Sequence, residues 1–252
     1  MAQSAKPTQL KPQTLEAFEA YIHKTEAEMK QTVLHHGSFL WSDANPERSK
    51  QVHKGEIVAQ FWSGQEPGKV PNGLIHDWIG AAFVCATNIK QTLALIQDYD
   101  NHKNIYKPEV IDSKLLSRHD NDFRIYLRLL KKKILTVVLE TDHDVHYRAV
   151  DPARWVCRSR TTRIAEVENA GSPTETVLPP DTGYGFLWRL NSYWRFQERD
   201  GGVLLECRAI SLTRDVPFGL GWIIEPIIQK LPKESLIKTL ESTRAALQAE
   251  TK

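Results

Sequence analysis

The sequence has few cysteines. It contains only Cys85, Cys157 and Cys207 in 252 residues, and no two of them form a CxxC pair. An odd number of cysteines at wide spacing indicates neither a zinc site nor a disulfide framework. We therefore expect neither a metal nor a cofactor.

Long apolar runs and a strong charge of one sign are also missing. No run approaches the roughly 18 apolar residues of a membrane-spanning helix. The net charge of +2 gives no electrostatic reason to expect binding to nucleic acid. The start of the chain lacks the charged and apolar regions of a signal peptide. We expect a soluble protein, either cytoplasmic or exported with the signal peptide absent from this chain.

Catalytic motifs are equally scarce. The sequence has no G-x-S-x-G elbow, no P-loop and no H-E-x-x-H pair. His143 and His146 resemble a metal pair at first sight, but residues three apart on a strand point to opposite faces. The sequence therefore indicates no particular reaction.

What is present is the composition and pattern of a globular chain. Hydrophobic residues make up 41% of the sequence, enough for one large core. Residues 1–50 are predicted to form a tail, a helix over 14–31 with Thr14 as its N-cap, and a connector. Residues 51–252 are predicted to form the main domain.

The main domain shows a regular order of elements. A hairpin over 55–62 and 74–84 precedes two short helices at 89–99 and 101–106. Six strands follow, at about 109–118, 122–131, 133–148, 154–168, 185–199 and 203–213. A long helix ends the chain, with a stripe of Leu236, Leu240, Thr243 and Leu247 and with Pro226 and Pro232 expected to interrupt it. The predicted fold is α+β, a curved antiparallel sheet of about seven strands wrapped on the C-terminal helix.

This order resembles the START-like (SRPBCC, helix-grip) superfamily, which includes lipid-transfer START domains and polyketide cyclases. The resemblance also rests on Leu95-x-x-Asp98-Tyr99 and Tyr106-x-Pro108-x-Val110-x-x-Ser113-x-Leu115, and it covers about residues 73–250. It implies a cavity between sheet and helix. The N-terminal helix, the strand at 55–62 and the loop at 170–184 depart from the pattern.

The alternation of side chains along each strand predicts where a ligand would lie. The apolar face should meet the helix, and on the later strands that face carries small residues between aromatic ones. Small residues under a helix leave volume for an apolar molecule, unless the helix segment with Trp222 and Ile223 fills it. The predicted ligand-binding residues are Leu127, Leu139, Cys157, Ser159, Thr161, Trp188, Ser192, Trp194, Cys207, Ala209, Ser211, Trp222 and Ile223.

The opposite face of the sheet is charged. It is expected to be solvated, with cross-strand ion pairs that each contribute about 0–1 kcal/mol. An anion-binding or partner surface is the alternative. If the faces were inverted in one strand, Arg128 or Arg160 would enter the pocket and select an anionic head group.

Three functions remain open. The first is binding or transport of an apolar small molecule, such as a lipid, a sterol-like or a polyketide-like compound, without catalysis. The second is a cyclase- or dehydrase-like enzyme that uses His76, Tyr126, His143 or Arg163. The third is a protein-interaction module with a filled core. A transient membrane contact by the apolar segment 216–224 and the oligomeric state also stay open.

Overall fold

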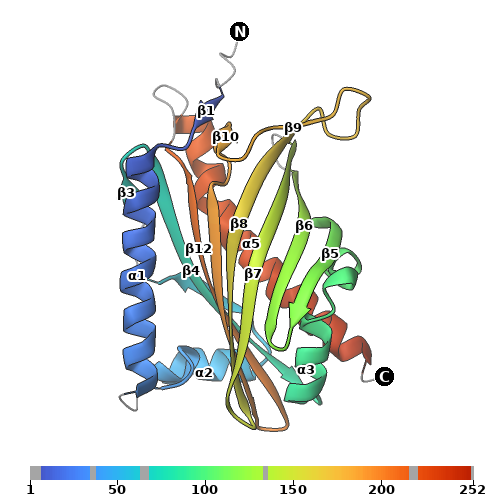
Figure 1. Ribbon diagram of the computed structural model, residues 1–252. Helices are drawn as coiled ribbons and strands as arrows, with labels where there is room; N and C mark the ends of the chain where they lie inside the picture. The colour runs from blue at the N-terminus through green and yellow to red at the C-terminus, as the bar shows by residue number, and fades with distance from the viewer. Residues whose placement is uncertain (1–6, 35–37, 63–67, 133–135, 216–220, 251–252) are drawn as a thin grey trace.

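One large antiparallel sheet forms the centre of the computed structural model, which describes residues 7–34, 38–62, 68–132, 136–215 and 221–250 (Figure 1). Seven of its strands have ten or more residues: β4 Gly73–Cys85, β5 Val110–His119, β6 Asp122–Lys132, β7 Thr136–Asp151, β8 Arg154–Glu168, β11 Arg189–Arg199 and β12 Gly202–Arg214. The shorter strands are β1 Thr8–Gln9, β2 Val58–Phe61, β3 Gly68–Val70, β9 Thr176–Val177 and β10 Thr182–Gly183.

The strand order confirms the predicted α+β fold. The main path is β2-β4-β12-β11-β8-β7-β6-β5, so each strand from β5 to β12 on that path lies beside its predecessor in the chain. The first long strand, β4, pairs with the last, β12. This pairing brings the two ends of the domain together and places β8, β11 and β12 side by side.

Residues that favour turns and helix caps mark the ends of several helices. Their bounds are α1 Pro12–Leu34, η1 Ser42–Ala44, α2 Pro46–His53, α3 Ile89–Ile96, η2 Tyr99–Asn101, α4 His102–Ile105 and α5 Gly221–Glu250. Asn88 and Gln91 form a capping box at the start of α3. Thr14 does not cap α1, which begins at Pro12; its hydroxyl donates to the Pro71 carbonyl instead.

The C-terminal helix α5 crosses one face of the sheet (Figure 1). Leu236, Leu240 and Leu247 are buried there in a cluster with Trp78 and Leu205. Gly80 permits this close approach, because a Cβ atom at that position would lie 2.9 Å from a Leu240 methyl group. The expected interruption at Pro232 is wrong, since α5 continues through this residue as one helix. A kink at Pro226 stays a prediction.

The N-terminal helix α1 lies against the opposite face (Figure 1). Its residues Phe18 and Ile22 are buried with Ile75, Ile210 and Leu212 of the sheet. A third cluster packs residues from η1 and α2 and their surroundings on the same side of β4 and β12; its buried members are Leu40, Val52, Ala81 and Leu204. The face expected to be solvated is therefore covered over these strands. The predicted domain boundary at residue 51 stays a prediction.

Charged side chains are buried beneath this N-terminal cover. Arg208 donates to both carboxylate oxygens of Asp77, and the two side chains are only 4% and 8% exposed. Glu206 accepts the backbone NH groups of Trp41 and Ser42. Each charge has a partner that offsets its loss of hydration. The N-terminal segment thus supplies hydrogen-bond donors that Glu206 would lack on the sheet alone.

Candidate functional site

Two neighbouring rows of side chains cross the α5 face of the sheet. Strand register aligns Val145, Ser159, Ser192, Ala209 and Trp78 in the first row. It aligns Tyr147, Cys157, Trp194, Cys207 and Gly80 in the second. None of these residues is charged, and the residues contributed by β8, β11 and β12 are small except for Trp194. The small-residue patch predicted from the sequence is thus continuous across three strands.

Several members of these rows are incompletely buried. Ser159, Ser192, Trp194 and Ala209 all retain partial accessibility, although their strands lie in the interior of the sheet and face α5. Cys157 and Cys207, one row away, are buried. The first row therefore keeps accessible surface on interior strands, whereas the cysteines of the second row do not.

A hydrogen-bonded histidine borders the first row. The ring of His143 contacts the Thr141 hydroxyl through Nε2 at 2.9 Å and the Ser159 hydroxyl through Nδ1 at 3.3 Å. Burial, together with the nearby His102, lowers the pKa of His143 to about 4. The imidazole is therefore neutral near pH 7. Thr141 was not among the predicted residues, although it shares the alternation of Val145.

Two more buried histidines are neutral for the same reason. Burial lowers the pKa of both His76 and His102 to about 4. His76 contacts the Thr213 hydroxyl through Nε2, and its Nδ1 has no partner among the described residues. His102 contacts the Ile96 carbonyl. Burial also raises the pKa of the Cys157 thiol to about 12, which leaves the thiol protonated and unreactive.

The remaining predicted residues lie at the margins of the rows. Leu127 packs against the cluster beneath α5, and Leu139 is buried opposite Leu129. Ser211 is paired with His76. Thr161 lies at a bulge, where its hydroxyl accepts the Leu190 NH. The side chains of Trp222 and Ile223 lie outside the described residues.

Trp188 does not belong to this site. It is 3% exposed and packs in the cluster of Phe18 and Ile22 against α1. Phe186, two residues before it, is 39% exposed. The prediction extended the strand back to residue 185, whereas β11 begins at Arg189. Alternation does not hold through the preceding turn, in which Gly185 has a φ of +75°.

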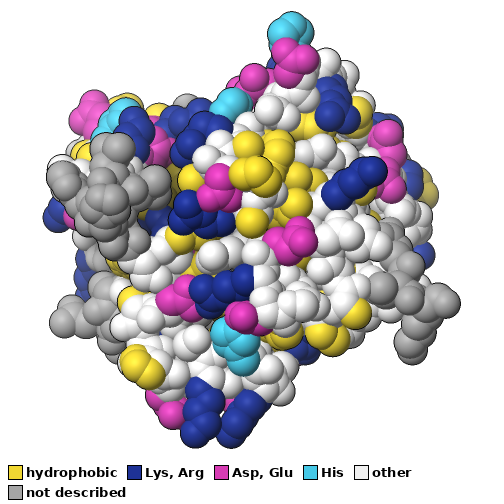
Figure 2. Space-filling model, turned by 90° about the horizontal axis from the view of Figure 1, so that it is seen from below, with side chains coloured by type: hydrophobic (Ala, Val, Ile, Leu, Met, Phe, Trp, Pro, Cys, Tyr) yellow, Lys and Arg dark blue, Asp and Glu magenta, His cyan; other side chains and the backbone are white. Residues whose placement is uncertain are grey.

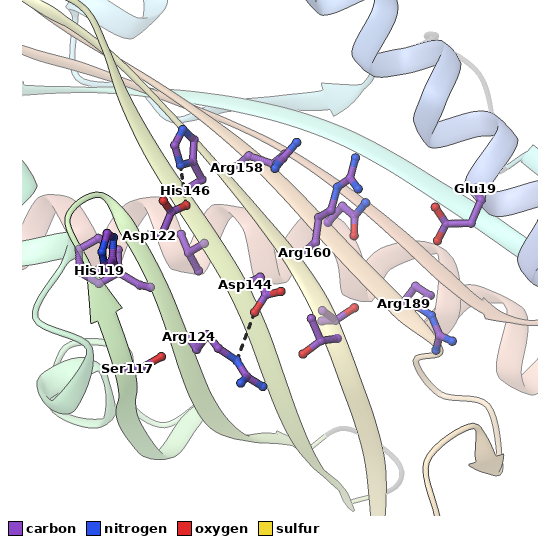
Figure 3. A pocket seen from close by; sticks show the side chains of 15 residues that line it. Glu19, Ser117, His119, Asp122, Arg124, Asp144, His146, Arg158, Arg160 and Arg189 are labelled. Atoms are coloured by element: carbon purple, nitrogen blue, oxygen red, sulfur yellow. Dashed lines mark hydrogen bonds and ion pairs between the residues drawn. The ribbon is translucent and has the colours of Figure 1, made fainter.

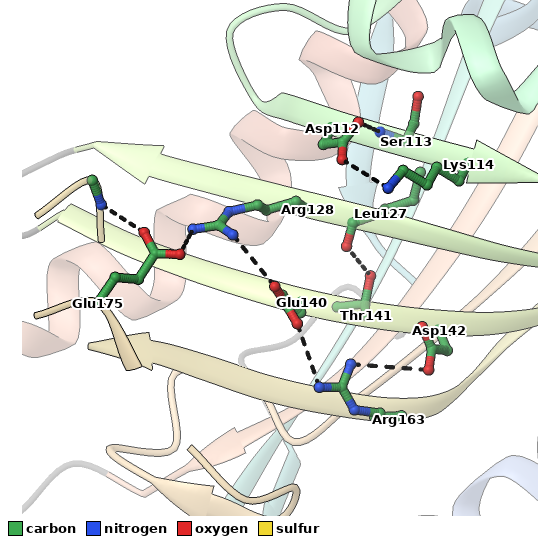
Figure 4. Close-up of polar contacts among 11 residues, drawn as sticks. Asp112, Ser113, Lys114, Leu127, Arg128, Glu140, Thr141, Asp142, Arg163 and Glu175 are labelled. Carbon is green, nitrogen blue, oxygen red and sulfur yellow. Dashed lines mark hydrogen bonds and ion pairs between the residues drawn. The ribbon is translucent and has the colours of Figure 1, made fainter. Parts of the chain in front are cut away.

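The four candidate catalytic groups are divided between the two faces. His76 and His143 lie on the α5 side, but Tyr126 and Arg163 do not. Figure 4 shows Arg163 on the outer surface between Glu140 and Asp142, beside the Arg128 pair with Glu175. Tyr126 alternates with the apolar β6 residues and interacts with Glu140. The groups proposed for a shared proton transfer are therefore separated by the sheet.

The outer face has a hollow of its own, of about 640 Å³. Figure 3 shows Arg158, Arg160 and Arg189 above the strands, with Glu19 of α1 at one side. Arg160 donates to Glu26, and Arg189 donates to Asp181. These contacts are ion pairs between helix or loop and sheet, so the inverted-face prediction for Arg160 and Arg128 is wrong.

An apolar hollow of about 710 Å³ lies between α3 and the β7–β8 hairpin. Ile89, Leu93 and Trp155 line it and also pack against the cluster beneath α5. Figure 2 shows hydrophobic side chains gathered on this lower side of the molecule, surrounded by charged ones. This hollow therefore lies next to the hydrophobic cluster beneath α5 and opens on the surface of the molecule.

No protein-family model and no curated protein matches the sequence. Solved structures with similar folds include a STAR-related lipid transfer protein from Xanthomonas axonopodis, with a TM-score of 0.49 and 14% identity over 73% of this chain and 98% of that one. The Zhui aromatase/cyclase from Streptomyces sp. R1128 has a TM-score of 0.48 and 13% identity over 71% and 96%. Human STARD10 has a TM-score of 0.45 and 9% identity over 83% and 82%.

At these identities the likeness concerns the fold alone. The predicted α+β arrangement, an antiparallel sheet covered by a C-terminal helix, is confirmed in the order of its elements. Among the described helices, none is long and apolar enough to cross a bilayer.

Proposed function

We propose that the protein binds or transports an apolar small molecule in the space between the sheet and α5. The row of Ser159, Ser192 and Ala209 supports this proposal, because these residues stay partly accessible on interior strands. Trp194 lies beside them and stacks on Phe196 at a centroid distance of 5.8 Å. Enclosure of an apolar molecule here would contribute about 25 cal/mol per Å² of apolar surface removed from water.

The experiment uses the full-length chain. Native mass spectrometry of the purified protein should detect a bound apolar compound. The delipidated protein should then enhance the fluorescence of an apolar dye, and added lipids should displace that dye. Absence of both bound compound and displaceable dye would favour the interaction module with a filled core and sink the proposal.

A cyclase-like activity has weaker support. Only two of its four candidate groups, His76 and His143, lie on the α5 side, and both are neutral because burial lowers the pKa of each to about 4. The four groups therefore do not converge on one side of the sheet, as a shared catalytic site would require.

A further inference from the structure

The hydrogen bonds around His143 determine where its ring proton lies. The hydroxyl of Thr141 donates its single proton to the Leu127 carbonyl at 3.1 Å. In its 2.9 Å contact with His143, the Thr141 oxygen must therefore accept. The proton of that contact comes from Nε2 of the imidazole.

This assignment determines the direction of the next hydrogen bond. A neutral imidazole has one N–H group, so Nδ1 of His143 presents only a lone pair. Ser159 Oγ lies 3.3 Å from that nitrogen and must donate to it. The Ser159 proton is then engaged, and its oxygen retains only the capacity to accept.

The neighbours of Ser159 within its row are uncharged, and the described charge nearest to the row on α5, Lys233, lies over Trp78 at the far end. These neighbours are Val145 and Ser192, followed by Ala209 and Trp78. The nearest arginines in β8, Arg158 and Arg160, alternate to the opposite face, where Arg160 pairs with Glu26. An anion beside Ser159 would meet no compensating charge from these rows.

We propose that the ligand is a neutral apolar molecule with a hydroxyl group, which donates its proton to Ser159 Oγ. The four protein groups, from Leu127 through Thr141 and His143 to Ser159, form a chain of hydrogen bonds that all point the same way, and the ligand hydroxyl extends it. A ketone or ether would place a second acceptor against the Ser159 oxygen. This inference rests on the proposed function and specifies its ligand class.

The test compares three probes in dye displacement from the delipidated, full-length protein near pH 7. They are n-dodecanol, its isomer methyl undecyl ether, and dodecanoate. Loss of one hydrogen bond weakens binding by about 2- to 10-fold. We therefore expect n-dodecanol to displace the dye at a several-fold lower concentration than the ether, and dodecanoate to be the weakest.

Two matched variants locate the effect. Ser159→Ala should reduce the preference for the alcohol over the ether to about one, because the acceptor is gone. Ser117→Ala removes an exposed hydroxyl on β5, outside both rows, and should leave the preference intact.

The outcomes separate the two proposals. If no apolar probe displaces the dye and no compound copurifies, the proposed function fails and this inference fails with it. If the probes bind but alcohol and ether bind equally, or if Ser117→Ala abolishes the preference, only the ligand class assigned to Ser159 is overturned.

Discussion

Helices cover both faces of the sheet, but the two faces differ in the charge of the side chains beneath those helices. The α1 side buries charges and pairs them, as Arg208 with Asp77 and Glu206 with two backbone NH groups. The α5 side carries neutral groups, including His143, and leaves small residues partly accessible. Paired charges fix one arrangement of the N-terminal cover, whereas the neutral face is the one on which we propose ligand binding. The comparison therefore predicts that substitutions on the two faces have different effects.

The largest effect is expected on the α1 side. Asp77→Ala leaves the buried Arg208 guanidinium without its carboxylate and should lower the free energy of unfolding by about 3–5 kcal/mol. Urea denaturation measures this. The control is Asp144→Ala, which removes an exposed pair with Arg124, at side-chain exposures of 61% and 64%, and should cost about 0–1 kcal/mol. Equal losses in both variants would contradict the burial of the Asp77–Arg208 pair beneath the N-terminal cover.

Lowering the pH should reduce the stability of the protein through a buried histidine on the α5 side. His143 keeps a pKa of about 4 in the folded state against an ordinary value of 6.5, so the unfolded chain binds more protons between these values. Stability should therefore be constant above about pH 7 and fall as the pH drops toward 4, by up to about 3 kcal/mol for this residue.

Urea midpoints at pH 7 and pH 5 measure this dependence. His143→Asn should reduce it, and His119→Asn should not, because the His119 side chain is 91% exposed. His76 and His102 contribute in the same direction. A protein equally stable at both pH values would show that these imidazoles are not buried in neutral form.

Replacing one alanine by leucine on each face tests which face has unfilled volume. Ala209→Leu should fill the gap beneath α5, weaken dye binding at least about 10-fold and change stability by less than about 1 kcal/mol. Ala81, 1% exposed on the α1 side, has no room, and Ala81→Leu should cost about 1–3 kcal/mol without blocking the dye. Similar destabilisation in both variants would indicate a filled core beneath α5.

The smallest effect on stability is expected for a substitution on the outer surface of the sheet. Arg163 contacts Glu140 at 3.4 Å and Asp142 at 3.9 Å, and its side chain is 32% exposed. Arg163→Ala should change stability by about 0–1 kcal/mol and leave ligand affinity unchanged. A large loss of binding in displacement titrations would place Arg163 at the site after all.

The sequence predicted the elements of the main domain because their signals are local. Alternation along β6, β8 and β12 identified the apolar face, and the short connections gave the meander. The same alternation gave Ser159, Ser192 and Ala209, which register then aligned in one row. It failed at Trp188, where no residue pattern marks the start of β11 at Arg189.

Contacts between segments far apart in the chain could not be predicted from the sequence. Alternation and turn chemistry act over a few residues, so by themselves they determined the strands, their order and the neutral, small-residue face. Only the tertiary structure decided that residues 12–53 cover the other face, since Tyr21 meets Asp77 and Trp41 meets Glu206 across long stretches of chain. It also decided the hydrogen bond from Ser159 to His143, because register brings together side chains from different strands that no local pattern relates.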